Sequence, residues 1–230
     1  MLENILGNVD KTKLYLSPTD HLHLNWVFDL ETLATEANSI VTEVSAVGFN
    51  LLSGEIVAEK TWHLDIDCQV QLGRVVSGGT IAFWLMQSEE AREKVAHASS
   101  EYCKRNGLPM PLPVGGFVLQ LAHFLKTTSE AWAAEDLENR NPQPLVWGNG
   151  ITFDLGKLHS LIRSVYGNDI WNYSAERDAR TYCGLAPSVK QAFWSDFRGI
   201  EHYGLDDCKH EIRYLVTIYN LICGGLEDKQ

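Results

Sequence analysis

Two acidic residues lie one residue apart in the apolar segment of residues 26–32, whose sequence is WVFDLET. If this segment is a strand, Asp29 and Glu31 point to the same side of it, because side chains alternate along a strand. Two like charges so close together repel each other and resist burial. A divalent cation that prefers oxygen ligands, such as magnesium, would compensate both charges. The pair therefore indicates a candidate metal site.

Further groups of the same kind occur later in the chain. Asp154 follows the short apolar segment PLVW at residues 144–147 and begins a helical pattern, and His202 precedes Asp207 in the segment HYGLDD. Four carboxylates and an imidazole at one end of a sheet could bind two magnesium ions roughly 4 Å apart, which clamp the attacking and leaving oxygens of a phosphodiester. Each motif alone has a simpler interpretation, such as a salt bridge at a sheet edge or a favourable acid at a helix start.

The acidic pair is expected on the first of three consecutive strands. Residues 24–32 have the pattern of a strand, and residues 39–66 contain two β-branched runs separated by the turn signal LSGE at residues 52–55, which predicts a hairpin. Helical patterns follow at residues 80–107 and 115–132. Thr80 and Ser88 are the candidate N-caps of two segments within the first of these ranges.

The second half of the chain alternates between strand and helix patterns. PLVW predicts a buried strand, and residues 155–165 carry apolar side chains at helical spacing. A short strand and a short helix are expected within residues 169–187, followed by a capping box at residues 188–191. A long last helix is predicted from an apolar stripe of Leu205, Cys208, Ile212, Leu215, Tyr219 and Ile222. The order predicts an α/β fold with a mixed β-sheet, antiparallel in its first three strands and then parallel, flanked by helices.

The composition is that of a globular protein. The chain has 230 residues, of which 45% are apolar and 21% charged, and without repeats or long linkers a single domain over residues 1–230 is expected. The net charge of −11 argues against a broad basic surface that coats nucleic acid, although metal loading would reverse the field at an acidic cluster. The five scattered cysteines lack CxxC spacing, so free thiols are expected. No apolar run approaches the roughly 20 residues that cross a bilayer, and residues 1–20 lack the pattern of a signal peptide, so we expect a cytoplasmic protein.

Taken together, the motifs resemble those of the DnaQ-like (DEDDh) 3′–5′ exonucleases of the ribonuclease H-like superfamily. Asp29 and Glu31 match the first motif, DxE, and Asp154 in WGNGITFDLGKL matches the second. The third motif, HxAxxD, is matched by His202 and Asp207, with a glycine at position 204 where alanine is usual. The segments FDLET, FWLMQSEEAR, VWGNGITFD and ERDARTY are similar to a phage and prophage branch, often named exodeoxyribonuclease VIII or related to a mycobacterial exoribonuclease. The resemblance extends over residues 22–222.

The resemblance implies a ribonuclease H-like fold and metal-dependent hydrolysis of nucleic acid from its 3′ end to nucleoside 5′-monophosphates. It implies that Asp29, Glu31 and Asp207 hold a first Mg²⁺ ion that activates water, and that Asp29 bridges to a second ion supported by Asp154. Mn²⁺ is expected to replace Mg²⁺. His202 would accept the proton of the attacking water as general base, a task suited to histidine, whose ordinary pKa lies near neutrality. The expected partner is single-stranded or 3′-end nucleic acid, DNA or RNA, and a homodimer is compatible with the resemblance.

Other residues carry weaker signals. Trp84 and Gln87 in FWLMQS, and Asn149, are candidate substrate contacts; Trp84 would stack on a terminal base or belong to the core, and Asn149 would bind substrate or only form a turn. Arg177 and Asp178 are expected to form a buried ion pair that orders the site. His21 and His23 are expected to be exposed, with no zinc site. 

Two other functions remain open from the sequence. A non-catalytic nucleic-acid-binding module is one, and the complete set of acids with His202 counts against it. The other is a two-metal phosphohydrolase of small nucleotides, which an acidic surface favours mildly.

Overall fold

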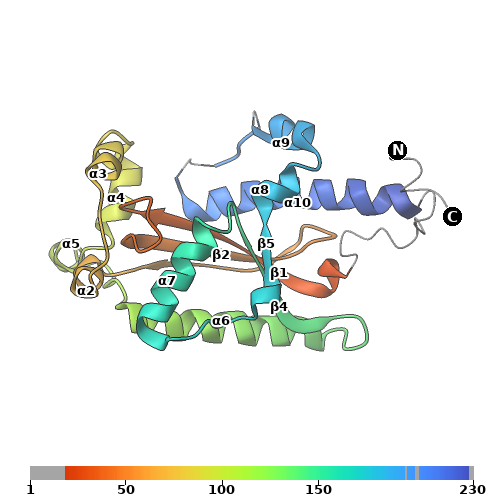
Figure 1. Cartoon of the computed structure of the whole chain (residues 1–230), viewed down its shortest axis with the longest axis horizontal. Helices are drawn as coiled ribbons and strands as arrows, with labels where there is room; N and C mark the ends of the chain where they lie inside the picture. The colour runs from red at the N-terminus through yellow and green to blue at the C-terminus, as the bar shows by residue number, and fades with distance from the viewer. Residues whose placement is uncertain (1–18, 195, 200–201, 228–230) are drawn as a thin grey trace, which may run out of the picture.

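The structure, a computed structural model, describes residues 19–194, 196–199 and 202–227, with residues 194 and 223–227 described by their backbone alone. Its centre is a five-stranded sheet of order β3-β2-β1-β4-β5 (Figure 1). The strands are β1 (His23–Thr32), β2 (Val41–Asn50), β3 (Ile56–His63), β4 (Asn141–Gly148) and β5 (Glu176–Asp178). Strand β1 is antiparallel to β2 and parallel to β4, β2 is antiparallel to β3, and β4 is parallel to β5. The predicted mixed sheet with an antiparallel start is therefore confirmed.

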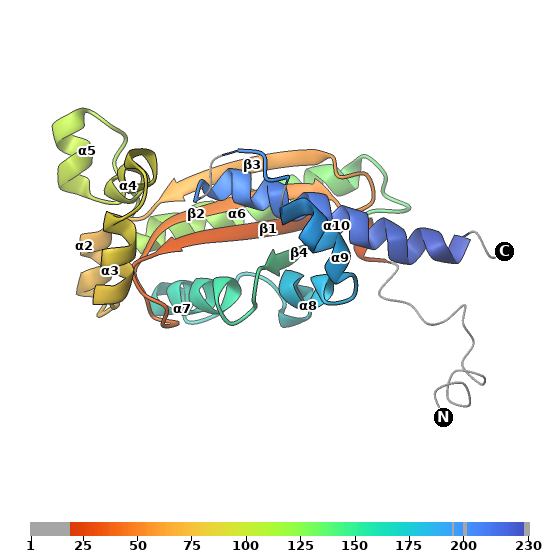
Figure 2. The same ribbon diagram turned by 90° about the horizontal axis from the view of Figure 1, so that it is seen from above.

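Helices cover both faces of the sheet. Among the described residues, the α-helices are α2 (Ile66–Gln71), α3 (Gly78–Leu85), α4 (Glu89–Ala96), α5 (Ser100–Asn106), α6 (Val114–Ala134), α7 (Asp154–Tyr166), α8 (Ala179–Cys183), α9 (Pro187–Trp194) and α10 (Gly204–Glu227). The same part of the chain contains the short 3-10 helices η2 (Asp20–Leu22) and η3 (Tyr173–Ala175). Helices α6 and α7 share one apolar core with the sheet, and α8, α9 and α10 share the other. Figure 2 shows α10 running across one side of the sheet, while α2 to α5 gather beyond one end of the strands.

The alternation of side chains along β1 separates the two cores. Trp26 and Phe28 belong to the core beneath α6, whereas Val27 belongs to the core beneath α10. Asp29 and Glu31 continue the side of Val27, so both carboxylates face α10. The prediction that they share one side of a strand is confirmed.

Most predicted elements are present, with corrections at their ends. The hairpin between β2 and β3 turns at Gly54, whose φ of +76° favours glycine, and Ser88 caps α4 by accepting the N–H of Ala91. Thr80 is not a cap, because Ser77 accepts the N–H of Thr80 at the start of α3. The region from residue 80 to 107 contains three helices instead of two segments, the last of them capped by Ser99. The capping box predicted at residues 188–191 is also wrong, because α9 already begins at Pro187.

The last helix follows its predicted stripe. Four of the residues, Cys208, Ile212, Leu215 and Tyr219, are buried against the sheet, and Leu205 and Ile222 are partly buried. The thiols of Cys68, Cys103, Cys183 and Cys208 are free as expected, and Cys223 lies outside the described side chains. Across the described residues, no helix has both the length and the apolar character that a membrane span requires.

Candidate active site

A cavity of about 620 Å³ lies where the acidic end of β1 meets the start of α10. Asp29 and Glu31 from β1 and Asp207 from α10 line it, and each offers a carboxylate oxygen within 4.8 Å of the others. His202 and Asn149 line the same cavity. The fold thus brings together residues that are up to 178 positions apart in the sequence, from Asp29 to Asp207. 

Burial and mutual repulsion keep these carboxylates from ionising at their usual pH. Burial, followed by repulsion from Glu31 and Asp207, raises the pKa of Asp29 well above its usual range. Burial, followed by repulsion from Glu43, raises the pKa of Glu31 to about 8. A divalent cation bound among these oxygens would reverse both effects, because it supplies the positive charge that the protein itself does not place there. The donor set, all carboxylate oxygens, fits magnesium or manganese.

Asp154 is buried beside this cavity at the first turn of α7. Burial raises its pKa to about 6, although the backbone N–H of Asn149 and the charge of Lys157 favour its ionised form. Its helix lies very close to the end of β4, since a β-carbon added at Gly148 would come within 3.0 Å of the Asp154 β-carbon. Glycine at position 148 therefore lets Asp154 approach the acidic strand, as the position after PLVW predicted.

The start of α10 is fixed by close packing on β2. A β-carbon at Gly204 would lie 2.8 Å from the β-carbon of Ser45, a separation that real side chains do not adopt. The N–H of Gly204 also stabilises the ionised carboxylate of Glu43. Glycine at position 204, where the third motif usually has alanine, therefore has a packing role.

His202 adopts a backbone conformation that is uncommon for a residue with a side chain. Its φ is +62°, in the left-handed region. The imidazole lies edge-on to two aromatic rings of α3, with centroid distances of 5.5 Å to Phe83 and 6.0 Å to Trp84. Strained backbone of this kind persists only where the surroundings determine it, and such residues cluster at functional sites.

Comparison with known proteins places this geometry in a family. A sequence profile described as the 3′–5′ exoribonuclease Rv2179c-like domain matches residues 24–219. The chain belongs to this family. It is thus a 3′–5′ exonuclease domain. Its motifs resemble those of the DEDDh nucleases, a class that is metal-dependent. The profile does not support the phage and prophage branch named exodeoxyribonuclease VIII. No curated protein sequence matches the chain at a significant level.

Solved structures show the same fold at low sequence identity. The nuclease domain of 3′hExo, a DEDDh family member bound to rAMP, is 15% identical with a TM-score of 0.51, and the match covers 90% of this chain and 94% of that one. Exonuclease I from Methylocaldum szegediense is 12% identical with a TM-score of 0.56, over 87% of this chain and 42% of that one. Cell-death related nuclease 4 (CRN-4) is 12% identical with a TM-score of 0.50, over 86% of this chain and 64% of that one. The ribonuclease H-like fold expected for the exoribonuclease-like domain is thereby confirmed.

The three residues proposed from sequence as substrate contacts have different positions in this exoribonuclease-like domain. Trp84 lines the cavity but is only 6% exposed, and its indole N–H donates to the carbonyl of Thr32. Asn149 also lines the cavity, and its buried Oδ1 atom has no hydrogen-bond partner. Gln87 is absent from the cavity lining, and its amide instead donates to the carbonyl of Phe83. Phe83, with 44% of its surface exposed, presents an aromatic ring to the cavity that sequence reasoning missed.

Sequence reasoning also missed two buried acids and a lysine near the site. Glu43 lies directly opposite Glu31 in the pairing of β1 with β2, and only the strand register reveals this. Glu211 lines the cavity from α10, and Lys190 lines it from α9. The spacing between Asp207 and Glu211 was a usable signal, because residues four apart share one face of a helix.

Three expectations about charged residues and histidines are corrected. Arg177 forms a bidentate ion pair with Asp20, at 2.7 and 2.9 Å, and not with Asp178. Asp178 instead caps α8 by accepting the N–H of Arg180. His21 and His23 are partly buried rather than exposed. The Nδ1 atom of His21 is hydrogen-bonded to the Tyr219 hydroxyl, and that of His23 to the Gln143 carbonyl.

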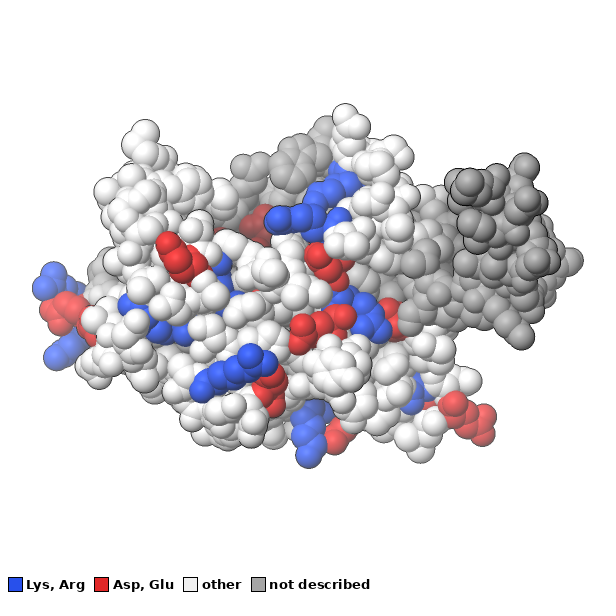
Figure 3. All heavy atoms as spheres, in the orientation of Figure 1, with Lys and Arg blue, Asp and Glu red and all other residues white. Residues whose placement is uncertain are grey.

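The distribution of surface charge can be followed on one face of the molecule (Figure 3). On the face drawn in Figure 3, basic and acidic side chains are interspersed and form no broad basic area. Among the described residues that line the cavity, Lys190 is the one lysine or arginine.

Proposed function

We propose that this domain removes nucleotides from the 3′ end of nucleic acid with two divalent cations, Mg²⁺ or Mn²⁺, and releases nucleoside 5′-monophosphates. The observation that carries the proposal is the convergence of Asp29, Glu31 and Asp207, whose oxygens lie within 4.8 Å of one another in a cavity shared with His202. Asp29, Glu31 and Asp207 would hold the first cation, and Asp29 and Asp154 the second. When bound, the cations would stabilise the charge on the attacking and leaving oxygens of the phosphodiester.

His202 is the proposed general base. Its imidazole would accept the proton of the attacking water, and edge-on contacts with the rings of Phe83 and Trp84 help to fix its orientation. The unpartnered Oδ1 atom of Asn149 is a hydrogen-bond acceptor for the terminal nucleotide. Phe83 and Trp84 offer aromatic surface to the terminal base, with Phe83 the more accessible of the two.

RNA is the substrate that we favour. The family description names an exoribonuclease, and one structural relative was solved with rAMP. Residues 22–222 are proposed to form a single catalytic domain, and the cytoplasmic location and the homodimer implied by the resemblance are likewise proposals.

The test is a product assay on matched RNA and DNA strands. Single strands of 2 to about 20 nucleotides, labelled at the 5′ end, would be incubated with Mg²⁺ or Mn²⁺, and a parallel set would carry a blocked 3′ end. We expect a ladder that shortens from the 3′ end, faster for RNA, and no reaction on the blocked strands. Cleavage confined to dinucleotides or free nucleotides would favour the small-nucleotide phosphohydrolase instead. Binding without any cleavage would favour the non-catalytic module.

A further inference from the structure

Glu211 is a fourth carboxylate lining the cavity, beside Asp29, Glu31 and Asp207, and the exonuclease motifs do not account for it. It lies four residues after Asp207 on α10, so both side chains are on the same face of the helix. Its side chain lines the cavity although the residue is only 6% exposed. The Oε1 atom is buried and has no hydrogen-bond partner. A buried carboxylate oxygen without a partner is costly, so this position needs an explanation.

The groups around Glu211 compensate its negative charge only in part. Asp154 is the acid that affects it most, and Asp178 adds to the repulsion. Lys190 from α9 and the hydroxyl of Tyr214 from α10 partly offset that repulsion. Burial and repulsion from Asp154 still raise the pKa of Glu211 to about 8. Lys190 is thus the basic side chain among the groups that act on Glu211, and it does not offset the burial of the carboxylate and its repulsion from Asp154.

The two cation positions differ in the ligands available to them. Asp29, Glu31 and Asp207 form a compact trio, whereas the second position has only Asp29 and Asp154 from the motifs. Glu211 interacts electrostatically with both of these acids. Magnesium takes oxygen ligands in octahedral geometry, so a further carboxylate there would fill a place otherwise left to water.

We propose that Glu211 is a ligand of the second cation, acting together with Asp29 and Asp154. The proposal rests on the two-cation function proposed above. It assigns the unpartnered Oε1 atom to the metal. The hydroxyl of Tyr214 favours the ionised form of the same carboxylate, which is the form that binds a cation.

The test is a titration of the metal-free full-length protein with Mn²⁺, in which calorimetry and electron paramagnetic resonance of the bound ion measure the number of sites and their affinities. We expect two sites in the unmodified protein. In Glu211→Gln the weaker site should lose roughly 10- to 100-fold in affinity, at least the effect of removing an outer partner of a metal site, and the tighter site should be unchanged. The matched control is Glu43→Gln, which makes the same change in another buried glutamate outside the cavity lining and should retain the second site.

The variants separate failure of this inference from failure of the proposed function. If Asp29→Asn abolishes Mn²⁺ binding while Glu211→Gln retains full affinity at both sites, the role of Glu211 is overturned and the two-cation function stands. If Asp29→Asn binds Mn²⁺ like the unmodified protein, both fail. An equal loss at the second site in Glu43→Gln would also overturn the inference, because it would reduce the effect to long-range charge.

Folding of the variants is checked by thermal melts without metal. Glu211→Gln should melt at or above the temperature of the unmodified protein, since it removes repulsion, and Mn²⁺ should raise its melting temperature less. If it does not fold, Glu211→Asp serves as the second variant, since it keeps the charge and withdraws the oxygens by one methylene. Unchanged Mn²⁺ affinity in that variant would overturn the inference.

Discussion

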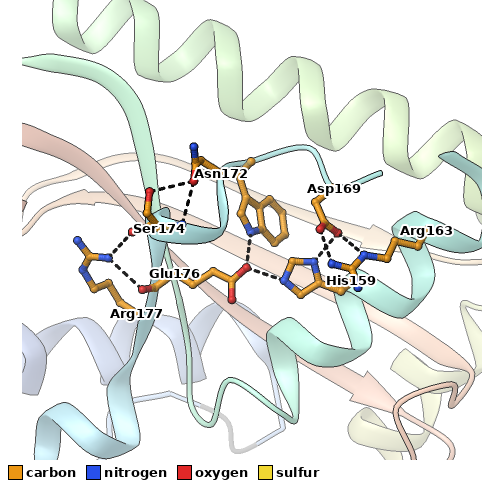
Figure 4. Close-up of polar contacts among 8 residues, drawn as sticks. His159, Arg163, Asp169, Asn172, Ser174, Glu176 and Arg177 are labelled. Carbon is orange, nitrogen blue, oxygen red and sulfur yellow. Dashed lines mark hydrogen bonds and ion pairs between the residues drawn. The ribbon is translucent and has the colours of Figure 1, made fainter. Parts of the chain in front are cut away.

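Two groups of acids in this domain have opposite surroundings. On α7, His159 lies between two carboxylates (Figure 4). Its Nδ1 atom is 2.6 Å from an oxygen of Asp169, and its Nε2 atom is 2.6 Å from an oxygen of Glu176. Arg163 also binds Asp169, and the indole N–H of Trp171 donates to Glu176. The hydrogen bond from Arg163, together with His159, lowers the pKa of Asp169.

The carboxylates of Asp29 and Glu31 in the cavity lack such partners, and burial with repulsion from neighbouring acids raises the pKa of both. Burial also raises the pKa of Asp154 beside the cavity, although the N–H of Asn149 and the charge of Lys157 act in the opposite direction. The carboxylates around His159 are paired by side chains of the protein itself, and these contacts hold α7 to the segment that leads into β5. The charges of the cavity carboxylates are not compensated in this way and would be compensated by a bound cation.

The largest effect is expected when a cavity acid is neutralised. Asp29→Asn should lower turnover by roughly 10³-fold or more, because cation binding contributes several kcal/mol to transition-state stabilisation. The metal-free variant should melt no lower than the unmodified protein, since a repelling charge is removed. Turnover would be measured on 5′-labelled RNA at saturating Mg²⁺. Retained turnover, or a large loss of metal-free stability, would place Asp29 with the structural acids.

Replacing His202 should have the next largest effect. His202→Ala should slow hydrolysis by about 10²–10⁴-fold, the usual contribution of general-base catalysis, while Mn²⁺ binding persists. His202→Asn is the matched control, because asparagine tolerates the left-handed backbone at this position but cannot act as the base. Both variants should slow equally if the imidazole matters, and the acidic limb of the rate profile should change.

A low rate in His202→Ala together with a normal rate in His202→Asn would contradict the role of His202 as base. The residue would then contribute to the reaction through its left-handed backbone conformation. An unchanged acidic limb in both variants would argue the same way, because that limb would belong to another group.

The stability of the metal-free protein should depend on pH in the direction set by the cavity. The pKa of Asp154 is raised to about 6 and that of Glu31 to about 8, so the folded state holds their protons more tightly than the unfolded state. Their contribution is full below about pH 4 and is lost as pH rises through 6 to 8. The melting temperature should fall by roughly 5–10 °C between pH 5 and pH 8.5. This range converts a difference of about two pKa units between the folded and unfolded states of one acid into a loss of stability, and that loss into a change in melting temperature.

Saturating Mg²⁺ should remove this fall, because the cation replaces the protons. Asp154→Ala, which should abolish turnover, should also melt with a smaller dependence on pH and remain folded. A circular dichroism melt in which metal-free Asp154→Ala is much less stable would show that Asp154 belongs with the structural acids.

The smallest effect is expected in the paired cluster. His159→Ala leaves the carboxylates of Asp169 and Glu176 without a shared partner, which should cost about 1–3 kcal/mol and lower the melting temperature by a few degrees. Turnover at a temperature well below the melt should be nearly unchanged. Loss of turnover without loss of stability would break the distinction between the two groups of acids.

The sequence predicted much of the site because its signals are local. Period-two alternation placed Asp29 and Glu31 on one side of β1, and the position after PLVW placed Asp154 at the start of α7. The sequence alone did not predict contacts between distant segments of the chain. The partner of Arg177 is Asp20, 157 residues away, and Glu43 is a neighbour of Glu31 only through the register of β1 with β2.

Other misses arose where similar local signals compete. Ser77 and Thr80 are both N-cap residues by type, and the backbone of the first turn decides between them. Residues 80–107 have continuous helical character, yet Ser88 and Ser99 each interrupt it by capping a new helix.

The contact between Gly204 and Ser45 links two positions that are far apart in the sequence. Ser45 is paired with Asp29 across β1 and β2, so whatever displaces the first turn of α10 from Ser45 also moves Asp207 relative to Asp29. An alanine at position 204, usual for the third motif, would clash with the β-carbon of Ser45 as well as its hydroxyl, so it requires glycine at position 45 or a displaced first turn of α10. Positions 45 and 204 should therefore change together during evolution, so that glycine occupies one of them. Such paired changes would preserve the distance between Asp29 and Asp207.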